Sequence, residues 1–139
     1  MSPEPRIEVI SLLLCDYAIT SRDGKVSAMG IFSQINVHRL PVAHGRFFIV
    51  AILETDPGPH ELHLQVVGPS GAVLLEQPPR LRIDVSRASS TANIVAELKG
   101  LRVNELGRHR IELRAGDRTL GGTPFTVSLV LRQPKAASA

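Results

Sequence analysis

The sequence predicts an all-β protein, an antiparallel β-sandwich of about eight or nine strands. In several short runs, apolar residues alternate with polar ones, which is the pattern of half-buried strands. Turn residues (Gly, Pro, Asp and Ser) separate these runs about every 8–12 residues, and no long stretch repeats with a helical period. A chain of 139 residues with 43% hydrophobic content is long enough for one domain with its own core.

We expect three parts along the chain. Residues 1–6 contain Pro3 and Pro5 and form a loose lead-in. Residues 7–132 form the single β-sandwich domain. Residues 133–139 are small and polar, which is typical of a frayed tail.

A long hairpin is expected at 9–37, with arms at 9–20 and 25–37. The turn at 21–24 ends in Asp-Gly, and Gly24 supplies the positive φ that a tight hairpin needs. The first arm is apolar on both faces from Leu12 to Cys15, which predicts a strand covered on two sides by a second layer. Strand 46–54 is also apolar on both faces and should be central in its sheet.

The second arm changes phase partway along its length. Val26 and Ala28 are out of phase with Ile35, and one extra residue at Met29-Gly30 would restore a single apolar face. We therefore expect a glycine bulge at Gly30. Asp16 follows an apolar run and needs a polar partner, for which Lys25 across the turn is the candidate.

Alternation predicts further strands at 60–66, 81–85, 91–99, 111–114 and 124–131, and a short strand at 73–75 is expected after the Gly-Pro-Ser-Gly turn. In 60–66, Glu61, His63 and Gln65 should face outward. The segment 91–99 also suits a short helix, because Ala, Glu, Leu and Lys favour one. In the last strand, Leu129 and Leu131 should face inward with the preceding apolar residues.

Two strands are candidate sheet edges. The strand 73–75 is short and is followed by Pro78-Pro79, which makes it a protected edge. The strand 81–85 places Arg80, Arg82 and Asp84 on its outer face, and these three residues are the candidate partner-binding site.

Charge and composition argue against several kinds of partner. The net charge is only +3, and four Phe, one Tyr and no Trp supply few rings for stacking bases, so we expect no nucleic-acid partner. No stretch approaches the roughly 18 apolar residues of a membrane span. A single cysteine allows no internal disulfide and fits a reducing compartment, so we expect a cytoplasmic protein.

No motif for catalysis, cofactor or metal binding is found. His60 and His63 would point to opposite faces of a strand, so they should not share a metal ion. Cys15 lies in a doubly covered strand beside an acidic residue, which favours a packed structural cysteine over a nucleophile. A hydrolase that uses His38 or His44 is the weakest alternative, since neither has an evident nucleophile.

One motif is more specific. Leu101, Glu105, Gly107, His109 and Ile111 fall at the spacing Leu-x-x-x-Glu-x-Gly-x-His-x-Ile. This resembles the corner before the sixth strand of immunoglobulin domains, where Leu, Asp, Ala or Gly, Tyr and Cys hold these places. The resemblance implies an immunoglobulin-like sandwich in which His109 takes the structural place of the tyrosine.

The chain also resembles an uncharacterised family of small bacterial immunoglobulin-like proteins. The residues that carry this are Cys15-Asp16-Tyr17-Ala18, Gly24-Lys25, Gly30-Ile31-Phe32, Pro41, His44 and Phe47, with the Gly-Pro-Ser-Gly turn and the segment 107–127. The resemblance implies no known activity. It assigns Cys15, Asp16, Gly30 and His109 no chemistry, and we expect these four residues to be structural.

We therefore expect a non-enzymatic, cofactor-free module for protein binding or assembly, which acts through self-association or a protein partner at a sheet edge. The alternative is a small-ligand or carbohydrate binder that uses the loops at one end of the sandwich. An acidic partner could also bind Arg108, Arg110 and Arg114, although a solvated strand face is the preferred interpretation.

Overall fold

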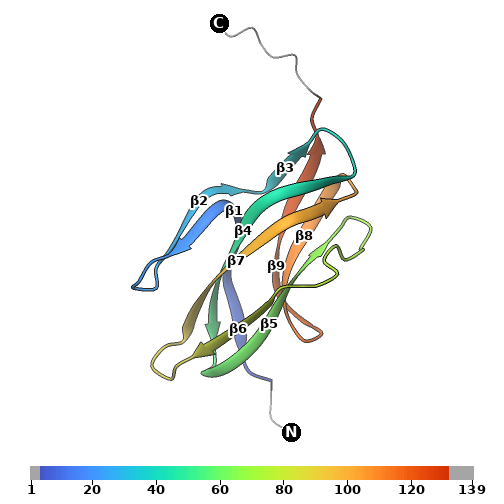
Figure 1. Cartoon of the computed structure of the whole chain (residues 1–139). Helices are drawn as coiled ribbons and strands as arrows, with labels where there is room; N and C mark the ends of the chain where they lie inside the picture. Colours follow the sequence, from blue (N-terminus) through green and yellow to red (C-terminus); the bar gives the residue numbers. More distant parts are fainter. Residues whose placement is uncertain (1–3, 132–139) are drawn as a thin grey trace, which may run out of the picture.

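A computed structural model of the chain describes residues 4–131, which form nine strands and no helix (Figure 1). The expected tail at 133–139 lies outside the described residues. The strands are β1 Ile7–Thr20, β2 Val26–Phe32, β3 Gln34–Val37, β4 Val42–Thr55, β5 Gly58–Val67, β6 Arg80–Val85, β7 Thr91–Val103, β8 Gly107–Ala115 and β9 Arg118–Leu129.

The strands form two sheets packed face to face, as the sequence predicted. One sheet has four strands in the order β2-β1-β4-β7, and the other has five in the order β3-β9-β8-β5-β6. Neighbouring strands are antiparallel except for β3 and β9, which pair in parallel. The segment 91–99, for which a helix was the competing prediction, lies within β7 and is a strand.

The main core lies between the sheets and is built from the inward residues of each strand. Its fully buried members include Phe47 and Ile49 of β4, Leu64 of β5, Ile111 of β8 and Phe125 of β9. β4 lies between β1 and β7, so its predicted central position is confirmed.

A second apolar cluster lies on the other side of the four-stranded sheet. Cys15, Ala18, Phe48 and Val50 are all buried there. The chain covers this face with its own hairpin, because the end of β1 and β2 fold back beside the sheet (Figure 1). Asn93 Nδ2 at the start of β7 donates a 3.1 Å hydrogen bond to the carbonyl of Gly24 at the hairpin turn. The predicted second layer over β1 is therefore present.

The second hairpin arm is not one strand, contrary to the prediction. It divides at Ser33: β2 stays with β1, and β3 joins the other sheet beside β9. The Ser33 carbonyl accepts a 2.9 Å hydrogen bond from the Thr126 amide, which starts this new pairing. The apolar residues change phase along the arm because the chain passes from one sheet to the other at Ser33.

The expected bulge at Gly30 is also wrong. Cys15 pairs with Ile31 and Tyr17 pairs with Met29, so the register is the same on both sides of Gly30 and no extra residue is inserted. Gly30 instead has φ +68°, a conformation that glycine adopts at little cost. The shift in register lies in β1, between Val9 and Ser11, where it pairs with β4.

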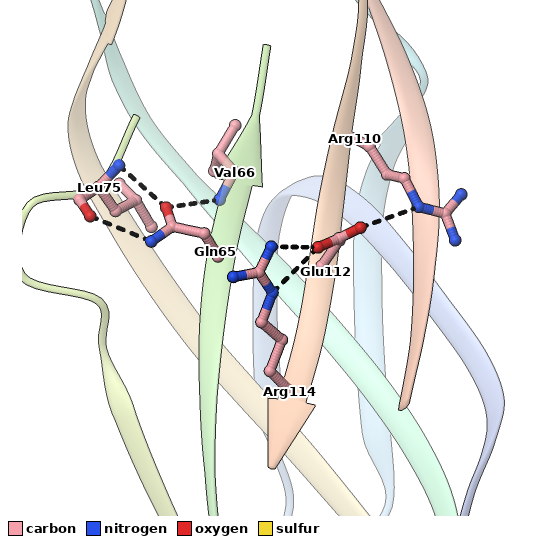
Figure 2. A network of polar contacts seen from close by, with 6 residues as sticks. All are labelled: Gln65, Val66, Leu75, Arg110, Glu112 and Arg114. Atoms are coloured by element: carbon pink, nitrogen blue, oxygen red, sulfur yellow. Dashed lines mark hydrogen bonds and ion pairs between the residues drawn. The ribbon is translucent and has the colours of Figure 1, made fainter. Parts of the chain in front are cut away.

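The segment 73–75 makes only one isolated bridge, between Val67 and Val73, and is not the predicted edge strand. Gln65 explains how this segment is held. Its Oε1 accepts hydrogen bonds from the amides of Val66 and Leu75, both at 3.0 Å, and its Nε2 donates to the Leu75 carbonyl at 3.1 Å (Figure 2). Gln65 is therefore buried under the segment. The prediction that it faces solvent is wrong.

The last strand ends earlier than predicted. β9 stops at Leu129, which is 49% exposed, and Leu131 is 82% exposed. Both leucines were expected to face inward, and both predictions are wrong. The end of β9 pairs with β3 alone at this point, beyond the last β8 partner Gly107, so no inward-facing layer remains to cover them.

Candidate functional site

β6 is the edge strand of the five-stranded sheet, and it carries the three residues that the sequence singled out. It pairs with β5 on one side, and no other described strand pairs with its second side. Arg80, Arg82 and Asp84 are exposed, while Leu81 and Ile83 pack against the core. The structure therefore brings the predicted residues together on one face of an open edge.

The charges on this edge are only partly neutralised. Arg80 Nη1 lies 3.8 Å from Glu61 Oε1, and both side chains are exposed, so this ion pair contributes little to stability. Within residues 4–131 no ion pair involves Arg82 or Asp84. A hollow of about 300 Å³ lies beside Arg80 and is lined by Glu61, Leu62, His63, Arg80 and Gly116. Arg82 and Asp84 are thus available to a second molecule.

The arginines of β8 are arranged differently from the arginines of β6. Glu112 lies between two of them, with Oε2 3.5 Å from Arg110 Nε and Oε1 2.5 Å from Arg114 Nη2 (Figure 2). The Glu112 side chain is only 15% exposed. A Cβ on Gly122 would lie 2.6 Å from Arg110 Nε, so a glycine is required for this arginine to lie across β9.

Two of the three β8 arginines are therefore occupied by a carboxylate of the chain itself. Of these three arginines, only Arg108 has no ion pair with another described residue. An acidic partner would have to compete with Glu112 for the other two. The candidate site narrows to the β6 edge.

Cys15 and Asp16 lie where β1 leaves β4 for the hairpin. Cys15 is fully buried, and burial raises the pKa of its thiol, which opposes use as a nucleophile. Asp16 is exposed and lies against Gly30. Its predicted partner Lys25 instead pairs with Asp23, at 3.6 Å between Nζ and Oδ2, so that prediction is wrong. Asp23 and Lys25 are only two residues apart in the turn, which favours this local pair.

His109 has the contacts that a corner residue needs. It is 1% exposed, and its ring stacks on Phe125 with centroids 5.1 Å apart. Its Nδ1 lies 3.0 Å from the Gly107 carbonyl oxygen, and because a carbonyl only accepts, Nδ1 carries the proton. Gly107 lies two residues upstream, so this bond is comparable to the backbone bond that the hydroxyl of a corner tyrosine makes.

His38 and His44 line one hollow of about 490 Å³ at an end of the sandwich. Its other lining residues are Asn36, Val37, Arg39, Val42, Ala43 and Gly45. Burial lowers the pKa of His44, and Asp16 partly opposes this. The lining includes no Ser, Thr or Cys. Both histidines stand out in the sequence, but only the fold shows that the 38–45 connection brings them to one hollow with Arg39.

The histidines of β5 point to opposite faces, as strand geometry requires. His60 is buried and its Nε2 lies 2.7 Å from the Asp56 carbonyl oxygen, whereas His63 lies on the outer face. Within residues 4–131, no three His, Cys, Asp or Glu side chains are grouped so that they could hold a metal ion. None of the described segments is a helix long and apolar enough to cross a membrane.

The two sheets, with their strand orders and the His109 corner, define an immunoglobulin-like β-sandwich. The chain belongs to a family of unknown function, DUF6941, whose sequence profile matches residues 10–128. The expected membership of an uncharacterised family is confirmed. A comparison with curated proteins finds no match.

Several solved structures contain a similar domain. An alkylpurine DNA glycosylase, AlkC from Pseudomonas fluorescens, matches with a TM-score of 0.50 and 16% identity over 87% of this chain and 30% of its own. A β-glucosidase from Listeria innocua matches with a TM-score of 0.50 and 12% identity over 92% of this chain and 16% of its own. An immunoglobulin-like protein from Pseudomonas aeruginosa matches with a TM-score of 0.40 and 14% identity over 88% of this chain and 97% of its own.

This chain spans less than a third of the length of the two enzymes that it matches. At these identities the likeness is one of fold. The activities of the enzymes are properties of those whole proteins.

Proposed function

We propose that this chain is a non-enzymatic protein-binding module that adds a strand of its partner to the edge of β6. The observation that supports this is the open edge itself, with Arg82 and Asp84 exposed and without ion pairs among the described residues. An added strand supplies backbone hydrogen bonds for affinity, and side-chain pairs supply specificity.

The charges on β6 suggest what the partner strand contains. Arg82 and Asp84 are two residues apart and therefore lie on the same face of the edge. A partner strand with an acidic residue opposite Arg82 would place a basic residue, two positions away, opposite Asp84. We infer an acidic-x-basic pattern in the partner strand when it is read in the direction of β6. The opposite charges on the two strands would hold them in one register.

The test is affinity purification from the source cells with wild type and with the charge-swapped variant Arg82→Asp/Asp84→Arg. The swap keeps the composition of the edge and leaves Leu81 and Ile83 on the core. A specific partner should bind wild type and be lost from the swapped variant. The matched control is Arg102→Glu, an exposed arginine on β7 of the other sheet, which should retain the partner.

The decisive step is the reciprocal swap in the captured partner. Exchanging its acidic and basic residues should restore binding to the swapped variant and abolish binding to wild type. Equal capture by wild type and the swapped variant would contradict edge addition at β6.

A second function is favoured by the hollow that His38, Arg39 and His44 line. Two imidazoles and a guanidinium suit a small anionic or polar ligand. The hollow thus supports the alternative function, a small-ligand binder that uses the loops at one end of the sandwich. A carbohydrate is the less suitable ligand, because the chain has no Trp and its single Tyr lies on β1 and not in this hollow. A metabolite and glycan screen by thermal shift, with His44→Ala as control, tests it.

We propose a bacterial, cytoplasmic setting for this module. The support is the resemblance carried by the opening residues and the use of a single, buried cysteine. Fractionation of the source cells with an antibody to the protein tests the compartment.

A further inference from the structure

The β1–β2 hairpin is apolar on both faces, but the chain covers only one of them. Ala18 and Ala28 pair across the hairpin and face the second cluster. Four larger apolar side chains of the hairpin, Tyr17, Ile19, Met29 and Ile31, are exposed, and we call them the outer hairpin face; at its inner edge the Tyr17 ring also packs edge-on against Phe48 of the second cluster, with ring centroids 5.4 Å apart. These side chains are 42%, 44%, 51% and 63% exposed.

The four residues form one contiguous surface. Tyr17 pairs directly with Met29, Ile19 lies two residues along β1, and Ile31 lies two residues along β2. If side chains of this size expose on the order of 200 Å² each, the outer hairpin face presents roughly 400 Å² of apolar surface. A stable interface needs about 800 Å² on each partner, so this face supplies about half of that area before its polar rim is counted.

The lack of charged residues on β2 indicates which kind of molecule can cover the outer hairpin face. No charged residue occurs from Val26 to Val37, so β2 and its continuation are neutral. In a twofold interface each surface meets a copy of itself, so a face with charges of one sign would oppose like charges. The neutral outer hairpin face meets its own copy without that cost. The β6 edge instead carries charges of both signs, which require opposite charges in register on whatever strand pairs with it.

β2 also lacks the features by which proteins protect an edge strand from association. Natural edge strands carry charged residues or proline for this purpose. β2 is the edge of the four-stranded sheet, and its sequence Val-Ser-Ala-Met-Gly-Ile-Phe has neither.

We propose that the outer hairpin face is a homodimer interface, in which the hairpins of two copies of this chain stack face to face about a twofold axis. Near the axis the Tyr17 ring of one copy packs against the Met29 thioether of the other, a contact favourable for sulfur and aromatic groups. Ile19 and Ile31 extend the contact on each side.

The proposal is tested by the mass of the protein in solution across a concentration series, from light scattering after gel filtration and from sedimentation equilibrium. Wild type should approach twice the monomer mass as concentration rises. Ile31→Glu should weaken the dimer by about a hundredfold or more, because a carboxylate would be buried without a partner. Circular dichroism and denaturation should show that the variant remains folded.

The matched control is Val73→Glu. Val73 is 57% exposed, comparable to Ile31, but it lies beside β5, away from the hairpin. Val73→Glu should dimerise like wild type, and so should Arg82→Asp/Asp84→Arg, which separates this proposal from the proposed function of β6.

Three results would overturn the proposal. A monomeric wild type at all concentrations would do so, as would a dimer that Ile31→Glu leaves intact. Binding of monomeric wild type to phosphatidylcholine vesicles, lost in Ile31→Glu, would assign the outer hairpin face to a lipid surface instead.

Discussion

Replacement of Gly30 by alanine tests how the hairpin folds over the sheet. Gly30 has φ +68°, where an L side chain is strained. A Cβ at this position would lie 2.4 Å from Asp16 Oδ2, 2.9 Å from Asp16 Cγ and 3.0 Å from Asp16 Cβ. Gly30→Ala therefore introduces both a backbone strain and a steric clash with one identified side chain.

The two costs have different sizes and can be separated. The left-handed conformation costs a non-glycine residue about 1–2 kcal/mol. Moving the Asp16 carboxylate away from its preferred rotamer costs about 1 kcal/mol more. We expect Gly30→Ala to lower the free energy of unfolding by about 2–3 kcal/mol in total.

A double-mutant cycle with Asp16→Ala measures the clash. In the Asp16→Ala background the Oδ2 and Cγ atoms are absent and only the 3.0 Å approach to the Cβ at position 16 remains, so Gly30→Ala should cost little more than the backbone strain of about 1–2 kcal/mol. The assay is equilibrium denaturation in urea, followed by circular dichroism. Gly24→Ala, where φ is +87° and no atom lies within 4 Å of the added Cβ, is the control for backbone strain alone. Strictly additive single-variant effects would refute the close approach of Asp16 to Gly30.

Three further predictions follow from other buried groups. Because Cys15 is fully buried, a thiol reagent should label it slowly in the folded protein and rapidly after denaturation; rapid labelling of folded protein would contradict a structural role. His109→Ala should lower the free energy of unfolding by about 1–3 kcal/mol, through lost stacking and a lost backbone hydrogen bond, and His109→Tyr should lower it less; denaturation curves measure both. Burial lowers the pKa of His44 in the folded state, so the unfolded state binds a proton first as pH falls below about 6.5, and stability falls with it. His44→Gln should flatten the pH dependence of the free energy of unfolding between about pH 7 and 5, and a variant with the pH dependence of wild type would contradict this effect of His44 burial.

The sandwich could be predicted because its strands have simple patterns. β5 and β6 alternate, and β4 is apolar on both faces, so its central position followed from composition alone. The His109 corner could also be predicted, since its five residues fall within one local stretch whose spacing alone carries the resemblance.

The second arm of the hairpin shows what the pattern of apolar residues could not predict. The phase change after Ala28 was a real signal, but a bulge and a change of sheet produce the same alternation. Which one occurs depends on whether Ile35 finds a buried place beside β9, and that is a long-range contact. Gly30 carried a signal too, but for a positive φ and not for an inserted residue.

Side-chain partners were harder to predict than strands. Gln65 alternates like a solvent-facing residue, and nothing local shows that the 72–75 segment returns to cover it. Asp16 was assigned Lys25 because the two lie near one turn, yet Asp23 is closer in sequence and takes that lysine. The β6 residues were placed correctly because Arg80, Arg82 and Asp84 alternate with apolar residues, whereas short length and neighbouring prolines wrongly predicted an edge strand at 73–75.

The two proposed surfaces should act independently because they lie at opposite ends of the strand order. β2 is the edge of one sheet, while β6 is the edge of the other and contacts β7 at the far side of the first. Substitutions at distant sites without shared contacts are usually additive. Ile31→Glu should therefore leave the affinity of one β6 site for an isolated partner peptide unchanged. It should weaken capture only by a partner that presents two such strands, because dimerisation doubles the sites that such a partner can engage. A loss of single-peptide affinity in Ile31→Glu, measured by calorimetry, would show that the hairpin and the β6 edge are coupled through the sandwich.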